Sequence, residues 1–260
     1  MTKKILCSFL SLIMLLTASV PYCVYAEDEL DVDNYLIAHG YPIQLINDMP
    51  EEEKLDLFNS NCYYESSKTY EYDENGKLIR ITTPEDSNII PYGQIKTSHL
   101  KLTITRSLEY SYSVITFNYK WNTLPVNRYQ DPICVAWDSS VFSLVSGSFR
   151  KVDQYRAVYP DNSSAAYTAT QSDERSYAKA TVDSVTWYAD LKGYSEYVVE
   201  LFGYGKFTLA PKKRDVNTQI FANYVHNKSA VSLSLTYIGG FTVSGSSPYD
   251  ELGTDITIKS

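Results

Sequence analysis

The sequence predicts a mainly β protein, in which an antiparallel β-sandwich follows a small N-terminal helical segment and a β-hairpin. Three observations favour this fold class. Apolar and polar side chains alternate over most of the chain beyond His99, turn-forming residues separate the alternating runs, and no helical spacing of apolar residues occurs after Phe58. Tyrosine is also abundant, with 24 residues in 260, and tyrosine suits strands whose faces are partly covered.

The first 26 residues have the features of a secretory signal peptide. Two lysines precede an apolar run from Ile5 to Leu16, and a small-x-small pattern ends at Ala26. Because the run is shorter than the roughly 20 residues that span a bilayer, we expect a secreted, extracellular protein without a permanent membrane anchor. The formal net charge is −8, and removal of the two lysines makes the remaining chain more acidic, which disfavours nucleic acid as a partner.

Residues 27–62 are expected to form three short helices. Gly40 is a C-terminal stop for the first helix, Pro42 begins the second, and Pro50 begins the third, where three glutamates follow it near the positive end of the helix dipole. Helices this short cannot make a core of their own. We therefore expect them to dock on the rest of the protein or to present an apolar face to a partner.

Residues 63–83 are expected to form a β-hairpin, because Asn75-Gly76 lies between two β-rich runs. The stretch YDENGKLI in this hairpin resembles one unit of the tyrosine–aspartate repeats of bacterial surface proteins. Residues 84–97 contain two prolines and a glycine and are predicted to be a linker, and residues 98–260 are assigned to the β-sandwich domain.

The sandwich domain is predicted to contain about eight to ten strands. The alternation changes face between Val114 and Ile115, which indicates a bulge, a turn or a strand that crosses between two sheets. Gly203 and Gly205 interrupt a later apolar run and predict a bulge or a bend. The alternating runs are Leu100–Ile104, Ile115–Trp121, Ile133–Trp137, Val185–Leu191, Tyr197–Leu209, Ile220–Tyr224, Val231–Tyr237 and Ile256–Ile258.

One stretch, YKWNTLPVNRYQDPICVAWD, concentrates chemically informative residues and supplies the candidate binding residues Trp121, Arg128, Asp131 and Trp137. In a structural interpretation, Arg128 and Asp131 form a bidentate ion pair that braces a loop above a tryptophan-lined core. In a functional interpretation, the tryptophans form an aromatic platform flanked by polar groups, of the kind that binds sugars. Both interpretations stay open at this point.

The spacing W-x3-P-x2-R-x2-D-x5-W in this stretch is similar to a segment of uncharacterised secreted β-rich proteins of Gram-positive bacteria. Their N-terminal regions also resemble YLIAHGYPIQLINDMPEEEKLDLF. The two segments cover under a fifth of the chain. The resemblance implies secretion and β-architecture, and it implies no activity.

Cys62 and Cys134 are the two cysteines that remain after signal-peptide removal. One disulfide between them is a natural expectation for an exported chain. The alternative is a pair of buried free thiols that pack as small apolar side chains. The sequence does not decide between these two states.

No cofactor and no metal site is expected from the sequence. His39, His99 and His226 lie far apart, no zinc-ligand spacing occurs, and no glycine-rich loop precedes a helix that could bind phosphate. We interpret each histidine as structural, at a helix end, a strand start and a strand end respectively. Nothing near either cysteine supplies a catalytic partner.

Three functional hypotheses follow from these features. The first is a secreted non-enzymatic binding or interaction protein that uses an exposed Tyr/Trp surface to contact an unknown extracellular ligand, such as a glycan or a cell-surface protein. The second is a cell-wall or polysaccharide hydrolase that uses paired carboxylates, with Asp183, Asp190, Glu196 and Glu200 as candidates. The third is a pore-forming or bacteriocin-like factor that uses the polar stretch SAAYTATQSDERSYAKATVDS.

Overall fold

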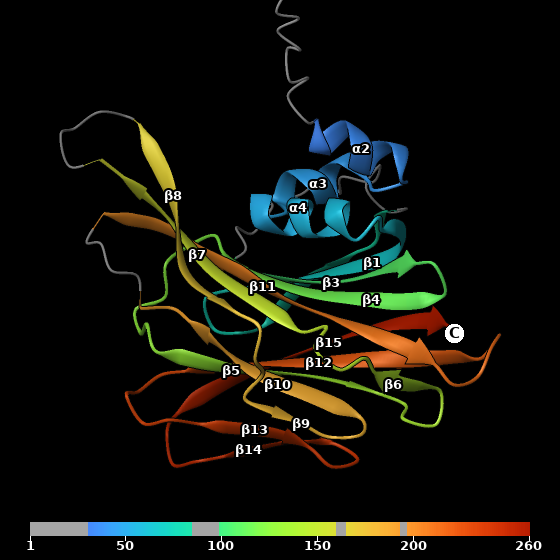
Figure 1. Ribbon diagram of the computed structural model, residues 1–260. Coiled ribbons are helices and arrows are strands. Elements are labelled where there is room, and N and C mark those ends of the chain that lie inside the picture. Colours follow the sequence, from blue (N-terminus) through green and yellow to red (C-terminus); the bar gives the residue numbers. More distant parts are fainter. Residues whose placement is uncertain (1–30, 85–98, 160–164, 193–196) are drawn as a thin grey trace, which may run out of the picture. The chain divides into compact units, whose positions relative to one another are not determined.

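The computed structural model describes residues 31–84, 99–159, 165–192 and 197–260 (Figure 1). The predicted signal peptide and residues 85–97 of the predicted linker lie outside these residues. Within the described residues the chain is mainly β, with two antiparallel sheets and three short helices, which confirms the predicted fold class.

The first sheet, sheet A, has eight strands, all paired antiparallel. In spatial order they are β2 (Leu78–Thr82), β1 (Tyr63–Tyr72), β3 (Leu100–Glu109), β4 (Tyr112–Trp121), β11 (Val198–Pro211), β7 (Arg150–Val158) and β8 (Ala166–Glu174), and the short β6 (Phe142–Leu144) pairs with β11. The predicted hairpin of residues 63–83 is therefore part of this sheet, since β1 pairs with β3 along its length. Residues Val32–Ser260 form one compact unit.

The second sheet, sheet B, packs below sheet A (Figure 1). Its strands, in spatial order, are β15 (Tyr249–Lys259), β12 (Asn217–Asn227), β5 (Gln130–Trp137), β10 (Ser184–Asp190) and β9 (Lys179–Ala180). A two-stranded hairpin, β13 (Ser234–Tyr237) and β14 (Phe241–Ser244), covers the outer face of sheet B. Leu233 and Leu235 there pack against Cys134 and Val225.

The main core lies between the two sheets and is rich in aromatic side chains. The ring pairs that cross from one sheet to the other include Phe117 with Trp187, Phe207 with Trp137, and Tyr119 with Tyr224, with ring centroids 6.2, 5.7 and 5.9 Å apart. Each buried aromatic side chain stabilises the fold by roughly 2–3 kcal/mol relative to an exposed one. These pairs set the spacing between the sheets.

Gly203 and Gly205 on β11 make room for this aromatic layer. A Cβ atom on Gly205 would lie 2.4 Å from the Trp187 ring, and one on Gly203 would lie 2.8 Å from the hydroxyl of Tyr119. The register of β11 with both neighbouring strands is unbroken through the two glycines. The bulge predicted at these positions is therefore wrong, and close approach of large rings explains the glycines instead.

The change of face at Val114 and Ile115 comes from a tight turn between β3 and β4. Tyr110 adopts a positive φ of 56° in this turn and is exposed. After the turn, Ile115 faces the core between the sheets, whereas Val114 faces the helices. A turn was one of the three predicted explanations, and it is the one that the structure shows.

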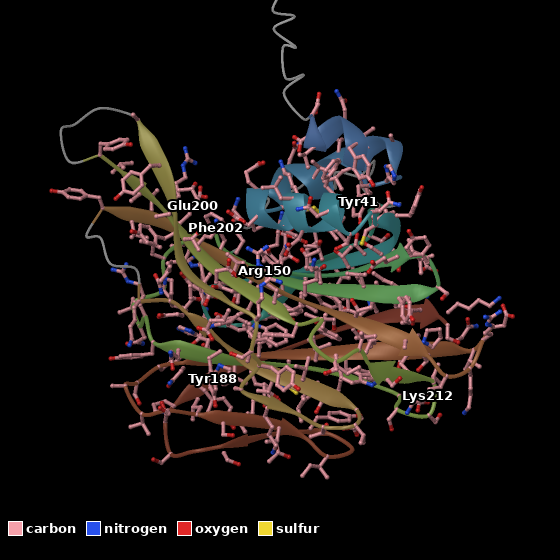
Figure 2. All side chains as sticks on the ribbon, viewed as in Figure 1. Tyr41, Arg150, Tyr188, Glu200, Phe202 and Lys212 are labelled. Atoms are coloured by element: carbon pink, nitrogen blue, oxygen red, sulfur yellow. The ribbon has the colours of Figure 1, made fainter. Side chains whose placement is uncertain are left out.

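The three predicted helices form and dock on the outer face of sheet A, so the docking alternative is confirmed (Figure 1). They are α2 (Val32–Ala38), α3 (Ile43–Asp48) and α4 (Glu51–Asn59). Gly40 ends the first with a φ of 88°, as predicted. Figure 2 shows two of the residues at the junction between helices and sheet, Tyr41 and Arg150: the Tyr41 hydroxyl donates to Ser107 at 2.7 Å, and Arg150 pairs with Asp56 of α4 at 2.6 Å.

The thiols of Cys62 and Cys134 are both free and buried. Cys62 packs beneath the helices on sheet A, whereas Cys134 packs beneath the β13–β14 hairpin on sheet B. Since the two thiols lie in separate clusters, the disulfide does not form and the alternative of two buried free thiols holds.

Glu53 of α4 is fully buried between the helix and sheet A, where the amide of Asn118 donates to its carboxylate. Burial raises the pKa of Glu53 to about 8, and donation by Asn118 offsets part of this effect. The folded state thus holds the Glu53 proton more tightly than the unfolded chain does. The free energy of unfolding must then fall as the pH rises from about 5 to about 8.

We expect Glu53→Gln to remove this component of the pH dependence, because glutamine keeps an acceptor for Asn118 and has no proton to lose. Relative to wild type, the variant should gain about 1.4 kcal/mol for each unit of pKa shift abolished. Urea denaturation between pH 5 and pH 8 measures the effect. Glu51→Gln, at an exposed position of the same helix, is the control and should leave the pH slope unchanged.

Candidate functional site

A pocket of about 350 Å³ lies where the ends of β4, β12 and β15 meet the β1–β2 turn, and we call it the end pocket. Tyr72, Leu100, Trp121, Leu124, Pro125 and Leu252 form its apolar wall. Its ionisable groups are Asp73, Glu74, His99, His226, Lys228 and Asp250. The volume is within the range of small-molecule sites, which combine an apolar lining with a few converging polar groups.

Trp121 is the last residue of β4 and forms part of the pocket wall. Its indole Nε1 donates to the hydroxyl of Tyr224 at 3.1 Å, and its ring lies 4.8 Å from the imidazole of His226. Tyr224 and His226 lie two residues apart on β12, and both contact Trp121, one by a hydrogen bond and the other by its ring. The indole is therefore held in one orientation.

Asp131, on β5, is fully buried behind the pocket and fixes this arrangement. Its carboxylate accepts hydrogen bonds from the Tyr224 hydroxyl at 2.5 Å, from His226 Nδ1 at 2.9 Å and from the Asn227 backbone N–H at 2.8 Å. Burial raises the pKa of Asp131, and the bonds from His226, Tyr224 and Asn227 counteract part of that rise. Because Nδ1 of His226 is bonded to Asp131, Nε2 is the nitrogen that remains for a ligand.

Nε2 of His226 has no hydrogen-bonding partner within the ranges that the structure describes. The imidazole is buried apart from the part that borders the end pocket. A ring held by a buried carboxylate on one side and open on the other is oriented for one hydrogen bond into the pocket.

The rim of the end pocket is acidic. His99, at the start of β3, faces Glu74 of the β1–β2 turn, with Nε2 3.9 Å from the carboxylate. Lys228 forms an ion pair with Asp250 at 2.7 Å, so its charge is already matched. The remaining rim carboxylates give the pocket a negative field, which disfavours anionic ligands.

Of the four residues predicted to bind, the structure brings Trp121 and Asp131 together at the end pocket. Arg128 is half-buried, and within the described chain it forms no ion pair with Asp131, so the predicted Arg128–Asp131 pair is wrong. Asp131 takes its donors from β12 instead. Trp137 lies away from this site, where its ring contacts Phe207 in the core.

Trp137 also borders a second hollow, an open groove of about 690 Å³ on the outer face of sheet B. Asp138, Asp183, Gln219, Phe221 and Tyr237 line this groove. The groove is shallow, and the Trp137 ring packs against Phe207 in the core instead of forming a platform in the groove. The end pocket is the better candidate site.

Sequence reasoning missed His99 and His226. Each was assigned a structural role because no other histidine or acid lies near it in sequence. At this end of the sandwich both histidines nevertheless line one pocket. The only available sequence signal was that both were expected at strand ends, which can meet at one edge of a sandwich.

Two of the four acids proposed for a hydrolase, Asp183 and Glu200, lie at different sheets and do not form a pair. Asp183 borders the groove on sheet B, whereas Glu200 lies on the other sheet beside Arg156 at 3.5 Å (Figure 2). Glu196 lies outside the described residues. Within the described part of the chain, no cluster of three potential metal ligands forms, and no helix has the length and apolarity to cross a bilayer.

Comparisons with known proteins add the following. No protein-family model and no curated protein matches the chain. Solved structures that resemble it include Clostridium perfringens delta-toxin (9% identity, 76% of this chain and 89% of that chain, TM-score 0.35) and a chain described as a pore-forming protein (10%, 62% and 88%, TM-score 0.30). The C-terminal domain of the Streptococcus agalactiae AgI/II polypeptide BspA is another (8%, 76% and 80%, TM-score 0.32). Likenesses this low carry no argument about function.

Removal of the Asp131 carboxylate should destabilise the folded protein. We expect Asp131→Ala to lower the free energy of unfolding by about 3–5 kcal/mol, because it leaves Tyr224, His226 and the Asn227 N–H without their acceptor. Tyr224→Phe removes one of the three donors and should cost roughly 1–2 kcal/mol. Arg128→Ala is the control, with an expected change within about 0.5 kcal/mol. Chemical denaturation measures all three, and an Arg128→Ala loss equal to that of Asp131→Ala would contradict the assignment.

Proposed function

We propose that this protein is a secreted, non-enzymatic binding protein that holds one neutral or cationic sugar unit of an extracellular glycan in the end pocket. The observation that carries the proposal is the convergence of Trp121, His99 and His226 on one pocket, with Asp131 behind it. The signal-peptide features of the first 26 residues support an extracellular site of action.

The apolar wall suits the less polar face of a sugar ring. Trp121, Tyr72 and four aliphatic side chains line the pocket where the ring C–H groups would lie, and burial of apolar surface favours association. The aromatic wall is already in place, because Tyr224 and His226 hold Trp121. Little conformational entropy is then lost on binding.

The polar groups suit ring hydroxyls. Nε2 of His226 and the imidazole of His99 each offer one donor or acceptor, and the rim carboxylates of Asp73 and Glu74 accept from hydroxyl groups. Because the rim is acidic and Lys228 is paired with Asp250, an amine on the sugar is favoured and a carboxylate or phosphate is disfavoured.

Isothermal titration with glucose, glucosamine, N-acetylglucosamine oligomers and glucuronate tests the proposal. We expect at least one neutral or amino sugar to bind, and glucuronate to bind at least tenfold more weakly. His99→Ala should weaken binding at least tenfold without loss of stability, since His99 is partly exposed at the rim.

His39→Ala is the matched control for this experiment. The third histidine stacks on Tyr35 of α2, outside the end pocket, so its loss should leave the affinity unchanged. No binding by any neutral or amino sugar, or equal affinity in the His99→Ala and His39→Ala variants, refutes the proposal.

Hydrolysis is a second candidate function, favoured by the 2.9 Å contact between Asp131 and Nδ1 of His226. A carboxylate that orients a histidine in this way prepares Nε2 to take a proton from water. Binding is placed first because, among the described residues, no hydroxyl or thiol is hydrogen-bonded to His226.

Chromogenic ester and glycoside substrates distinguish the two functions. If His226 acts as a base, His226→Gln should reduce turnover at least a hundredfold. Under the binding proposal, we expect no turnover above the rate of the His226→Gln variant.

A further inference from the structure

The strand β8 (Ala166–Glu174) ends sheet A, and one of its long sides has no strand beside it among the described residues. It pairs with β7 on the other side, from Val158↔Ala166 to Lys151↔Glu174. Figure 1 shows β8 at the end of the sheet, on a hairpin that extends past the other strands. An open strand of this length presents a row of backbone donors and acceptors.

Among the edge strands of sheets A and B, the other three are protected and β8 is not. The edge strand β9 has two residues, β2 carries Arg80 within five residues, and β15 carries charges from Asp250 to Lys259. By contrast, the segment Ala166–Ser172 contains no charged residue and no proline. Charges, proline and short length are the usual means of preventing edge-to-edge pairing, so their absence from one edge alone marks that edge as an interaction surface.

The pairing of β8 with β7 shows which backbone groups are open. The N–H of Tyr159 donates to the carbonyl of Ala165, so Ala165 directs its backbone groups toward β7. Alternate residues of an antiparallel pair point in opposite directions, which leaves Ala166, Thr168 and Thr170 with backbone groups directed away. The register shift between Asp153 and Gln154 interrupts this alternation at Gln171.

A group of tyrosines lies beside the open edge. Tyr167 of β8 is 5.0 Å from Tyr159 and 6.5 Å from Tyr155, measured between ring centroids, and Tyr159 is 46% exposed. Partly exposed tyrosines are enriched where proteins associate, because they bury large area at low entropic cost. The edge and the tyrosines together form one surface.

We propose that β8 pairs with β8 of a second copy of this chain, antiparallel and centred on Thr168, which joins the two copies of sheet A. In this register Thr168 faces Thr168 of the second copy, and Ala166 faces Thr170. All open backbone groups before the register shift are then satisfied, and Thr–Thr pairs are favourable across strands. Tyr167 lies opposite Ala169 of the second copy, which has the space to accept it.

Charge selects this orientation and this partner. Asp173 and Glu174 end the strand. A parallel arrangement would place these acids beside their own copies, whereas the antiparallel one places them beside the uncharged start of the other strand. The symmetric pairing closes after two copies, since each copy has one such edge.

Analytical ultracentrifugation of the protein at increasing concentration tests the proposal. We expect a species of twice the monomer mass that Thr168→Lys abolishes, because two ammonium groups would lie opposite each other. Thr257→Lys makes the same change on exposed β15 at the edge of sheet B and should leave the dimer intact. Thr168→Pro should also give monomer, since the lost N–H points away from β7 and the hairpin is preserved.

Cysteine cross-linking keeps the test decisive if a β8 variant is unstable. Thr168→Cys should give a covalent dimer under mild oxidation, whereas Thr257→Cys should not, and the two native thiols are buried and do not react. A protein that stays monomeric at every concentration, or a dimer that persists in Thr168→Lys and fails to cross-link through residue 168, overturns the proposal. Dimer loss does not affect the sugar titration, because β8 contributes no residue to the end pocket.

Discussion

The contacts between aromatic side chains of sheet A and sheet B determine where polar groups enter the core and where the end pocket forms. Phe117, Trp187 and Phe207 fill the middle of the layer with carbon alone, apart from one indole nitrogen. Toward one end the crossing rings are Tyr119 and Tyr224, whose hydroxyl groups cannot be buried without partners. The change from phenylalanine to tyrosine along the layer therefore brings polar groups into the core.

Two buried carboxylates meet that requirement. Asp153 accepts from the Tyr119 hydroxyl at 2.8 Å, and Asp131 accepts from the Tyr224 hydroxyl. Desolvation raises the pKa of both acids, and several hydrogen-bond donors around each carboxylate offset part of the free-energy cost of burying it. His226 is one of the donors to Asp131. The carboxylate that accepts from the buried Tyr224 hydroxyl therefore also holds the His226 ring at the pocket wall. The wall of the end pocket is thus positioned by hydrogen bonds that satisfy buried polar groups of the core.

The period of the apolar residues was sufficient to predict the sandwich, because burial on one face of a strand imposes a period of two. Glycine and proline marked the three helices, and Asn75-Gly76 marked the first hairpin. The apolar pattern does not state which strands are neighbours. β4 pairs with β11, far along the chain, and β12 lies between β5 and β15. Trp121 and Asp131 could be singled out from residue type and proximity in sequence. The partners of Asp131 could not, since they depend on the pairing of β5 with β12.

The two thiols are sequestered in different layers, and burial raises the pKa of Cys134 to about 11 and that of Cys62 to about 12. Almost no thiolate exists near neutral pH in the folded protein, and thiolate is the form that attacks disulfides and reacts with oxidants. Once folded, the protein therefore shields both of these sulfur atoms from exchange with other thiols and disulfides. Its native packing around Cys62 and Cys134 is compatible with reducing and oxidising surroundings alike.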